Sequence, residues 1–321
     1  MKAKGEVCES LFSFLNHFLI FYFQYLVFGT LVVTSLGAAY LFYSLFLRKK
    51  KAKILLKEVD KKYEVTLIEK EVITRNTRRF RFALPSNEYE LGLNLGQHIY
   101  LSTYIDDKLV VRSYTPVSGQ HVKGFFDLVV KIYFKNENPK YPEGGKMSQH
   151  LDSMKIGDKI NIRGPDGNLI YKGKGKFAIR KNKTSPFIFY EYKKCGMIAG
   201  GSGLTPMLQL LRAALEDSED ETQFWLLFAN QSEEDILLRS ELELLAKRHP
   251  SKFHLWFTVS KANNNWKYSL GHIDADMIKN SMPPPDDKTL ILLCGPPPMI
   301  NLACKPNLDA LGYKSQHRHI F

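Results

Sequence analysis

A glycine-rich segment, Gly200-Gly-Ser-Gly-Leu-Thr-Pro206, carries the clearest chemistry in the sequence. It directly follows an apolar strand-like run and opens an amphipathic helical pattern, with Pro206 placed to suit a first helical turn. Glycines let the backbone approach a phosphate closely, and the free N–H groups of a helix N-terminus stabilise its negative charge. The segment therefore predicts a nucleotide site. It departs from the standard dinucleotide fingerprint, because Ala229-Asn-Gln-Ser stands where that motif places an acid.

Three other clusters hold residue types that bind anions or rings. In Arg112-Ser-Tyr-Thr-Pro-Val-Ser118 the guanidinium suits a phosphate, and the Tyr and Thr suit a ring and its polar edge. In Gly144-Gly-Lys-Met-Ser148 a glycine pair lets N–H groups approach an anion. Cys294-Gly-Pro-Pro-Pro-Met299 ends the last apolar strand, where open α/β sheets bind ligands. Taken singly, the three also fit structural roles: a strand ending in a proline turn, a surface loop and a proline-rich strand cap.

The secondary-structure elements that must position these clusters follow two different sequence patterns, one in each half of the soluble part of the chain. From Tyr63 to about Tyr171, short runs rich in β-branched and aromatic residues alternate with turns, which predicts a small antiparallel β-barrel. A Lys- and Gly-rich stretch, 172–192, is expected to be a linker. From 193 to 321, apolar strands alternate with amphipathic helices, as in a parallel α/β sheet. The expected strands are 196–199, 224–228, 253–258 and 290–294; one helix begins near Leu204 and another runs from about Glu233 to Arg248.

Residues 1–53 are interpreted as a membrane anchor with a basic juxtamembrane segment. No Asp, Glu, Lys or Arg occurs from Ser10 to Leu47, and about 20 apolar residues suffice to span a bilayer. Tyr25–Leu47 is the more apolar half. The positive residues that follow, Arg48, Lys49, Lys50, Lys51 and Lys53, predict that the rest of the chain lies in the cytosol. The tract is too long for a signal peptide, and a hairpin is the alternative to a single span.

The overall composition indicates which classes of binding partner the protein could have. With 45 basic and 33 acidic side chains, the formal charge of +12 favours an acidic partner or an anionic membrane surface. No zinc spacing, recognition helix or stacking motif indicates nucleic-acid binding. The four cysteines, Cys8, Cys195, Cys294 and Cys304, form no CxxC pair, so no metal site is expected and a reducing compartment fits. Nothing in the sequence indicates an oligomeric state.

Taken together and in this order, the clusters resemble the cytochrome b5 reductases of the ferredoxin–NADP reductase superfamily. The resemblance covers roughly Tyr63 to Phe321. It rests on Lys131-Ile-Tyr-Phe, Gly144-Gly-Lys-Met-Ser, Arg163-Gly-Pro, Gly200-Gly-Ser-Gly-Leu-Thr-Pro-Met, Leu227-Phe-Ala-Asn-Gln, Asp235-Ile-Leu-Leu-Arg and Cys294-Gly-Pro-Pro-Pro-Met. It implies an FAD-binding β-barrel at 63–171 and an NAD(P)H-binding α/β domain at 193–321.

The same resemblance implies the site residues. Those for FAD are Arg112, Tyr114, Thr115, Pro116, Val130, Lys131, Tyr133, Gly145, Lys146, Met147, Ser148 and Thr205. Those for the nicotinamide nucleotide are Gly200, Gly201, Ser202, Gly203, Pro206, Ser260, Cys294, Gly295, Pro296 and Met299. Three are expected to be catalytic: Thr115 would stabilise negative charge on the reduced flavin, Lys131 would orient nucleotide and flavin, and Cys294 would place the nicotinamide.

The implied reaction passes a hydride from NADH to FAD and then single electrons to cytochrome b5, an acidic haem protein on the same membrane. That membrane would be the endoplasmic reticulum or the outer mitochondrial membrane. The basic run Lys172, Lys174, Lys176, Arg180, Lys181 and Lys183 is a candidate contact for the cytochrome, or else a solvated loop.

Two positions depart from the family pattern. Ser260-Lys-Ala stands where the family usually has an acid that favours NADH, so we expect NADH to be preferred but NADPH to be discriminated against less strongly. Asp166 is also unusual beside the flavin-domain turn. Two other functions remain open. A flavin reductase for another acceptor, such as a quinone, would share every site residue; a membrane-tethered scaffold with decayed sites is opposed by the intact clusters.

Overall fold

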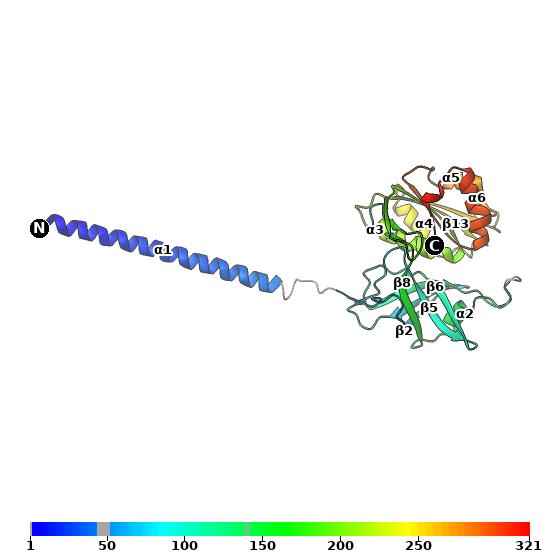
Figure 1. Ribbon diagram of the computed structural model, residues 1–321, viewed down its shortest axis with the longest axis horizontal. Coiled ribbons are helices and arrows are strands. Elements are labelled where there is room, and N and C mark those ends of the chain that lie inside the picture. The colour runs from blue at the N-terminus through cyan, green and yellow to red at the C-terminus, as the bar shows by residue number, and fades with distance from the viewer. Residues whose placement is uncertain (1, 44–51, 138, 140) are drawn as a thin grey trace. The chain divides into compact units, whose positions relative to one another are not determined.

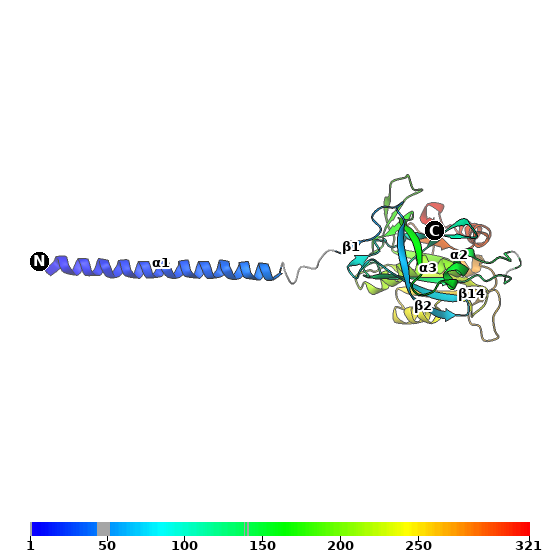
Figure 2. The ribbon, with the colours of Figure 1, turned by 90° about the horizontal axis from the view of Figure 1, so that it is seen from below.

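The computed structural model describes residues 2–43, 52–137, 139 and 141–321. A single unbroken helix, α1 (Lys2–Phe42), forms the N-terminal part in both views (Figures 1 and 2). The described tract is therefore one helix rather than a hairpin. Its part His17–Phe42 has 26 residues with a mean hydropathy of 1.8. At 1.5 Å per residue this part is about 39 Å long, which exceeds the roughly 30 Å of a bilayer core.

The last four residues of the expected span Tyr25–Leu47, residues 44–47, lie outside the described ones. The same holds for the basic cluster, of which only Lys53 is described. Among the described residues, His17–Phe42 is the one helical segment long and apolar enough to cross a membrane.

Residues 52–321 form one compact unit that contains two large sheets in separate lobes (Figure 1). The first sheet is antiparallel, with the strand order β6-β5-β8-β2-β3-β7. Its members are β2 (Tyr63–Thr74), β3 (Thr77–Ala83), β5 (His98–Ile105), β6 (Lys108–Tyr114), β7 (Phe125–Lys131) and β8 (Lys159–Asp166). Phe80, Phe82 and Leu101 are fully buried in its core. The antiparallel architecture predicted for this part is confirmed.

Shorter elements complete the first lobe. Helix α2 (Lys146–Ser153) packs against β6, and β1 (Lys53–Ile54) pairs with β4 (Tyr89–Glu90). The segment 172–192, expected to be a linker, holds two strands. These are β10 (Lys176–Ile179) and β11 (Ile188–Glu191), which form a three-stranded antiparallel sheet with β9 (Leu169–Tyr171).

The second large sheet is parallel, with the order β15-β14-β13-β12-β16-β17. Its strands are β12 (Lys194–Gly200), β13 (Gln223–Asn230), β14 (Phe253–Val259), β15 (Ser269–Leu270), β16 (Thr289–Cys294) and β17 (Arg318–Ile320). Successive side chains of a strand point to opposite faces. Met197 accordingly packs with α3 (Leu204–Glu216) and α4 (Arg239–Arg248), while Ile198 packs with α5 (Ala275–Ser281) and α6 (Lys305–Ala310). Both faces are covered, as a parallel sheet requires.

Of the two helices predicted for this part, the structure confirms the first and shortens the second. The apolar face expected for the first is confirmed, since Leu204, Met207, Leu208, Leu211 and Leu215 are all buried in α3. The second was expected from about Glu233, which is wrong, because α4 begins at Arg239. The preceding residue, Leu238, has a left-handed φ of 53° that a helix does not accommodate.

Candidate functional site

The glycine-rich segment and the proline loop meet at the carboxyl ends of two neighbouring strands. β12 lies between β13 and β16, so the chain leaves β12 toward β13 while β16 flanks its other side. Ala199 pairs with Cys294 at the ends of these strands. This reversal of strand order is the point at which open α/β sheets bind ligands. The predicted nucleotide residues 200–203 and 294–296 are therefore brought together.

Close backbone packing at this junction explains why glycines occupy it. A Cβ added to Gly203 would lie 2.2 Å from the carbonyl oxygen of Cys294, and one added to Gly200 would lie 2.6 Å from Sδ of Met299 and 3.0 Å from Cδ of Pro296. A Cβ on Gly295 would lie 3.1 Å from the backbone nitrogen of Gly200. Any side chain at Gly203 would thus separate the two loops.

The start of α3 supplies free backbone donors at the same place. Gly201–Gly203 form a 3₁₀ turn, and the N-cap residue Gly203 has no side-chain cap. The hydroxyl of Thr205 donates to the carbonyl oxygen of Ser202 at 3.2 Å, which fixes the turn. Uncapped N–H groups at a helix start suit an anion such as a phosphate. Pro206 is buried within the first turn of α3, where it needs no amide donor.

On the flavin side, Tyr133 organises the second glycine cluster. Ser148 Oγ accepts from the Tyr133 amide at 3.2 Å and donates to the Gly145 carbonyl at 3.0 Å, and the Gly145 amide donates to the Tyr133 carbonyl at 2.8 Å. A Cβ on Gly145 would lie 2.5 Å from Ser148 Oγ, so a side chain there would displace the hydroxyl from these hydrogen bonds. Lys146 is exposed while Met147 is buried.

The cluster on β6 presents a guanidinium without a carboxylate. Arg112 is exposed and donates to the Val111 carbonyl at 2.7 Å, and no acid pairs with it among the described residues. Burial raises the pKa of Tyr114 well above its usual value, and the neighbouring Arg112 and Tyr133 act on it in opposite directions. Thr115 is half-buried at the end of the strand. This arrangement offers a cation, a neutral phenol and a hydroxyl to one ligand.

The remaining candidates contribute in more limited ways. The Val130 side chain is buried in the core of the first lobe, and Pro116 is also buried. Burial raises the pKa of Cys294 to about 11, so its thiol stays protonated at neutral pH and is not a nucleophile. Lys131 Nζ lies 2.7 Å from Asp235 Oδ1.

The two halves of the candidate site adjoin. The hydroxyl of Tyr133 lies 3.4 Å from that of Ser202, which joins the glycine cluster of the first lobe to the glycine-rich segment of the second. At the end of β13, both Nδ2 and Oδ1 of Asn230 are buried without a hydrogen-bond partner, and the adjacent Ser260 is half-buried. A donor, an acceptor and a hydroxyl at this edge fit the polar edge of a nucleotide.

Comparison with known proteins identifies the two lobes. Residues 64–171 match the family described as the oxidoreductase FAD-binding domain, and residues 197–305 match the oxidoreductase NAD-binding domain. The NADH-cytochrome b5 reductase 3 of Rattus norvegicus is 55% identical over 296 residues, covering 91% of this chain and 98% of that protein. The NADH-cytochrome b5 reductase 2 of Xenopus laevis is 56% identical over 272 residues, covering 85% and 92%.

The chain belongs to the NADH-cytochrome b5 reductase family. Among solved structures, the cytochrome b5 reductase domain of Ulva prolifera nitrate reductase superposes with a TM-score of 0.78 at 42% identity, covering 82% of this chain and 98% of that domain. The family and the fold class predicted from the sequence are confirmed.

Several residues that join the two lobes of this family member were not singled out from the sequence. Gln209 of α3 accepts from the Gly96 amide at 2.7 Å and donates to the Pro116 carbonyl at 3.1 Å, and Arg212 donates to the Val117 carbonyl at 2.6 Å. These side chains hold the two lobes together. A polar Gln209 on the buried face of an otherwise apolar helix was the signal that could have revealed it.

Asp166, noted from the sequence as unusual beside the flavin-domain turn, has a structural account. Its side chain is 5% exposed, forms an ion pair with Lys183, and accepts from the hydroxyl of Tyr100 at 3.0 Å and the amide of Gly167 at 2.8 Å. Burial alone would raise the pKa of Asp166, but these hydrogen bonds, led by that of Lys183, bring it below its usual value. The carboxylate ties the segment between β10 and β11 to the first lobe.

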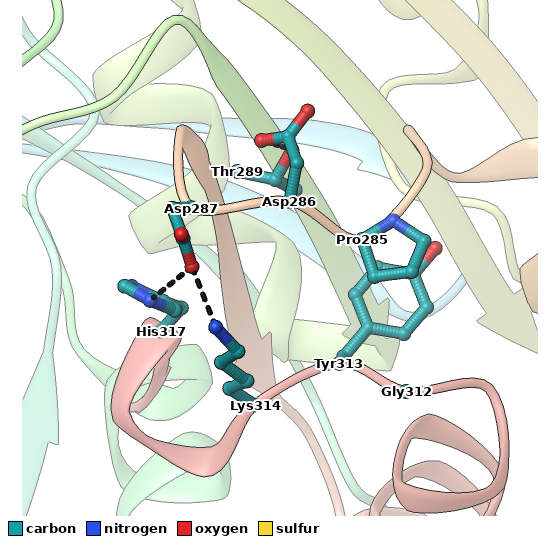
Figure 3. A pocket seen from close by; sticks show the side chains of 8 residues that line it. All are labelled: Pro285, Asp286, Asp287, Thr289, Gly312, Tyr313, Lys314 and His317. Atoms are coloured by element: carbon teal, nitrogen blue, oxygen red, sulfur yellow. Dashed lines mark hydrogen bonds and ion pairs between the residues drawn. The ribbon is translucent and has the colours of Figure 1, made fainter.

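A cavity of about 240 Å³ lies elsewhere, lined by Pro285, Asp286, Asp287, Thr289, Gly312, Tyr313, Lys314 and His317 (Figure 3). Asp287 faces Lys314 at 2.8 Å and His317 at 3.6 Å across it. Thr289 begins β16 and Cys294 ends it. The cavity is therefore at the opposite end of the sheet from the candidate nucleotide site.

Proposed function

We propose that the protein is an NADH-cytochrome b5 reductase with FAD as its resident cofactor. The observation that carries the proposal is the junction of the lobes, where the hydroxyls of Tyr133 and Ser202 lie 3.4 Å apart. The relatives at 55–56% identity bear this name, and both domain families match. When bound, FAD accepts a hydride from NADH and releases electrons singly, a chemistry that side chains do not supply.

For the flavin, the available donors suit a dinucleotide. Arg112 has no carboxylate partner among the described residues, so its guanidinium is free to pair with the pyrophosphate. The exposed Lys146 and the amides at the start of α2 would hold the same group. Tyr114, kept neutral by burial, would contact the ring system. The hydroxyl of Thr115 would donate to the ring edge and stabilise negative charge there.

The other predicted flavin residues have narrower roles. Val130 would offer its backbone, because its side chain is in the core. Pro116, Met147 and Ser148 would shape and fix the loops, and Tyr133 and Thr205 would border the ring at the junction.

For the nicotinamide nucleotide, the glycine-rich segment and the start of α3 would hold the pyrophosphate. Cys294, Gly295, Pro296 and Met299 would place the nicotinamide, since they pack directly on Gly200 and Gly203. The protonated thiol of Cys294 would position the ring without forming a covalent bond.

Selectivity between NADH and NADPH would be modest. Ser260 and Asn230 bear no charge that repels a 2′-phosphate, and Lys261, which is exposed, would attract one. NADH remains the preferred donor in this proposal. Comparing kcat/KM for the two nucleotides tests it, and a preference for NADH of more than about 1,000-fold, or 4 kcal/mol, would contradict it.

The acceptor would dock on exposed lysines. Within the basic run, Lys174 pairs with Glu219, Lys183 pairs with Asp166, and Arg180 lies 3.7 Å from Asp166. The other members, Lys172, Lys176 and Lys181, are exposed and form no ion pair among the described residues. These three would attract an acidic cytochrome. We therefore expect kcat/KM for the cytochrome to fall steeply as the ionic strength rises. Replacing them by glutamine should raise KM for cytochrome b5 and leave ferricyanide reduction unchanged.

Helix α1 would anchor the enzyme to the cytosolic face of the endoplasmic reticulum or outer mitochondrial membrane. The support is the apolar segment His17–Phe42, with the positive residues beyond it in the sequence. Alkaline carbonate should leave the full chain in the membrane pellet and release a chain that starts at Ala52. Recovery of the full chain in the supernatant would refute the anchor.

The function is tested by assaying purified full-length protein in detergent with NADH and either cytochrome b5 or a soluble quinone. Rapid reduction of cytochrome b5 supports the proposal. Quinone reduction without cytochrome b5 reduction would replace it by a flavin reductase for another acceptor. A colourless protein inert toward both acceptors would support the scaffold.

A further inference from the structure

Asp235 joins three segments across the junction of the two lobes. It lies on the loop between β13 and α4, and its Oδ1 accepts from Lys131 Nζ at 2.7 Å and from Asn76 Nδ2 at 2.9 Å. Lys131 ends β7, and Asn76 lies in the turn between β2 and β3. Ser232 Oγ donates to the other carboxylate oxygen at 3.3 Å. The NAD-binding lobe thus supplies the counter-charge of a lysine that belongs to the FAD-binding lobe.

Asn76 is itself held, which fixes the carboxylate. Its side chain is buried, and its Oδ1 accepts from the hydroxyls of Thr74 at 3.3 Å and Thr77 at 3.4 Å. The amide nitrogen is therefore the group turned toward Asp235. The Asn76 carbonyl also accepts from the Ile132 amide at 2.7 Å. If Asp235 moved together with Lys131, it would lose the hydrogen bond from Asn76 Nδ2.

The charge on Asp235 persists at neutral pH. Burial alone would raise its pKa, but the hydrogen bonds from Lys131 and Asn76 outweigh that effect and bring the pKa below its usual value. The side chain of Lys131 is 12% exposed, so solvent competes little with the carboxylate. The ammonium group is consequently held at the end of β7, a strand that contacts the Gly201–Gly203 turn of the candidate nucleotide site.

We propose that Asp235 is a positioning residue that fixes Lys131 Nζ for binding of the nicotinamide nucleotide. The inference rests on the proposed function, because Lys131 is expected to orient nucleotide and flavin. A flexible lysine ordered before binding loses less conformational freedom when its ligand arrives. The coupling also links nucleotide affinity to the alignment of the lobes, since the carboxylate and the lysine belong to different lobes.

The test uses the full-length, flavin-loaded protein with Asp235→Asn, which keeps the shape and an acceptor for Asn76 but removes the charge. Calorimetric titration with NAD⁺ measures affinity without turnover, and NADH–ferricyanide kinetics separate KM from kcat. We expect the Kd for NAD⁺ and the KM for NADH to rise roughly tenfold, while kcat changes less than about twofold. Asp235→Glu, which restores the charge, should recover part of the affinity.

A double-mutant cycle with Lys131→Ala separates positioning from scaffolding. If Asp235 acts through Lys131, Asp235→Asn adds no further loss of NAD⁺ affinity to the Lys131→Ala variant. Glu241→Gln is the matched control, because Glu241 pairs with Arg212 at the same interface of the lobes at 2.7 Å. It should lower the melting temperature and leave the Kd for NAD⁺ unchanged.

Different results would overturn the role of Asp235 and the proposed reductase function. An unchanged Kd in Asp235→Asn, or losses that multiply in the double variant, would overturn the role of Asp235 while leaving the reductase proposal intact. A wild-type protein that carries no flavin or binds no NAD⁺ would overturn the proposed function itself.

Discussion

Replacing Gly203 by alanine tests the close packing of the glycine-rich segment on the proline loop. The backbone of Gly203 has φ −64° and ψ −3°, which alanine adopts without strain. The added methyl group would lie 2.2 Å from the carbonyl oxygen of Cys294 and 2.5 Å from its carbon. Both atoms are backbone, so a rotamer change cannot relieve the contact. The ends of β12 and β16 must move apart.

The size of the effect follows from this geometry. Ordinary contacts of a Cβ begin at 3.4 Å, so the two loops must separate by about 1 Å. Overpacking of this kind costs about 1–3 kcal/mol of stability. A misplacement of about 1 Å at a reacting centre lowers the rate by about 100-fold. We therefore expect Gly203→Ala to reduce kcat with NADH by about two orders of magnitude, with a melting temperature lowered by several degrees.

The matched control is Gly196→Ala in the middle of β12. There the methyl group would meet side chains only, Ile291 Cδ1 at 2.6 Å and Met282 Sδ at 3.1 Å, away from the strand ends. This variant should lose stability to a similar extent but keep its kcat. Stopped-flow reduction of the flavin by NADH compares the two. Equal rates in both variants at a temperature where both are folded would refute the packing argument.

Two further predictions concern Ser260 and Asp166, at which the sequence was expected to depart from the family pattern. Ser260→Asp should raise the preference for NADH over NADPH about tenfold or more, because a carboxylate repels the 2′-phosphate; an unchanged ratio of kcat/KM values would show that Ser260 does not meet the ribose. Asp166→Asn should lower stability at pH 7 by about 1–3 kcal/mol, through loss of the charged hydrogen bonds to Lys183 and Tyr100. Because the folded pKa of Asp166 lies below its usual value, the difference should be full above about pH 4 and shrink as the pH falls through the folded pKa. Chemical denaturation at several pH values measures it, and a difference that grows on acidification would contradict the sign.

The parts of the fold that local pattern determines could be predicted from the sequence. Apolar runs bounded by glycine predicted β12 and β16, and the spacing of Leu204, Met207, Leu208 and Leu211 predicted the buried face of α3. The junction of the glycine-rich segment with Cys294 followed from the rule that parallel strands share one carboxyl edge. The strand and helix predictions depend on neighbours within a strand or a turn of helix, whereas the junction depends on the edge that parallel strands share.

The errors arose where distant contacts decide the structure. The residues just before α4 have a helical sequence pattern, but they do not form a helix. Asp235 instead pairs with Lys131, and Glu233 pairs with Arg239 at 3.0 Å. The segment 172–192 was predicted to be a linker because it is rich in lysine. It nevertheless contains β10, which pairs with β9, and β11, which pairs with β10. The role of Asp166 likewise depends on its ion pair with Lys183 and is not indicated by the residues beside it. Pairings of this kind have no signature in local sequence.

The central claim is a flavoprotein that passes electrons from NADH to cytochrome b5, and an anaerobic titration tests it most directly. Purified full-length protein should be yellow, and one equivalent of NADH per flavin should bleach it. Adding oxidised cytochrome b5 should then restore the yellow colour while two haems are reduced per NADH consumed, as electron balance requires. A protein without flavin, a flavin that NADH does not bleach, or a bleached flavin that leaves cytochrome b5 oxidised would contradict the account.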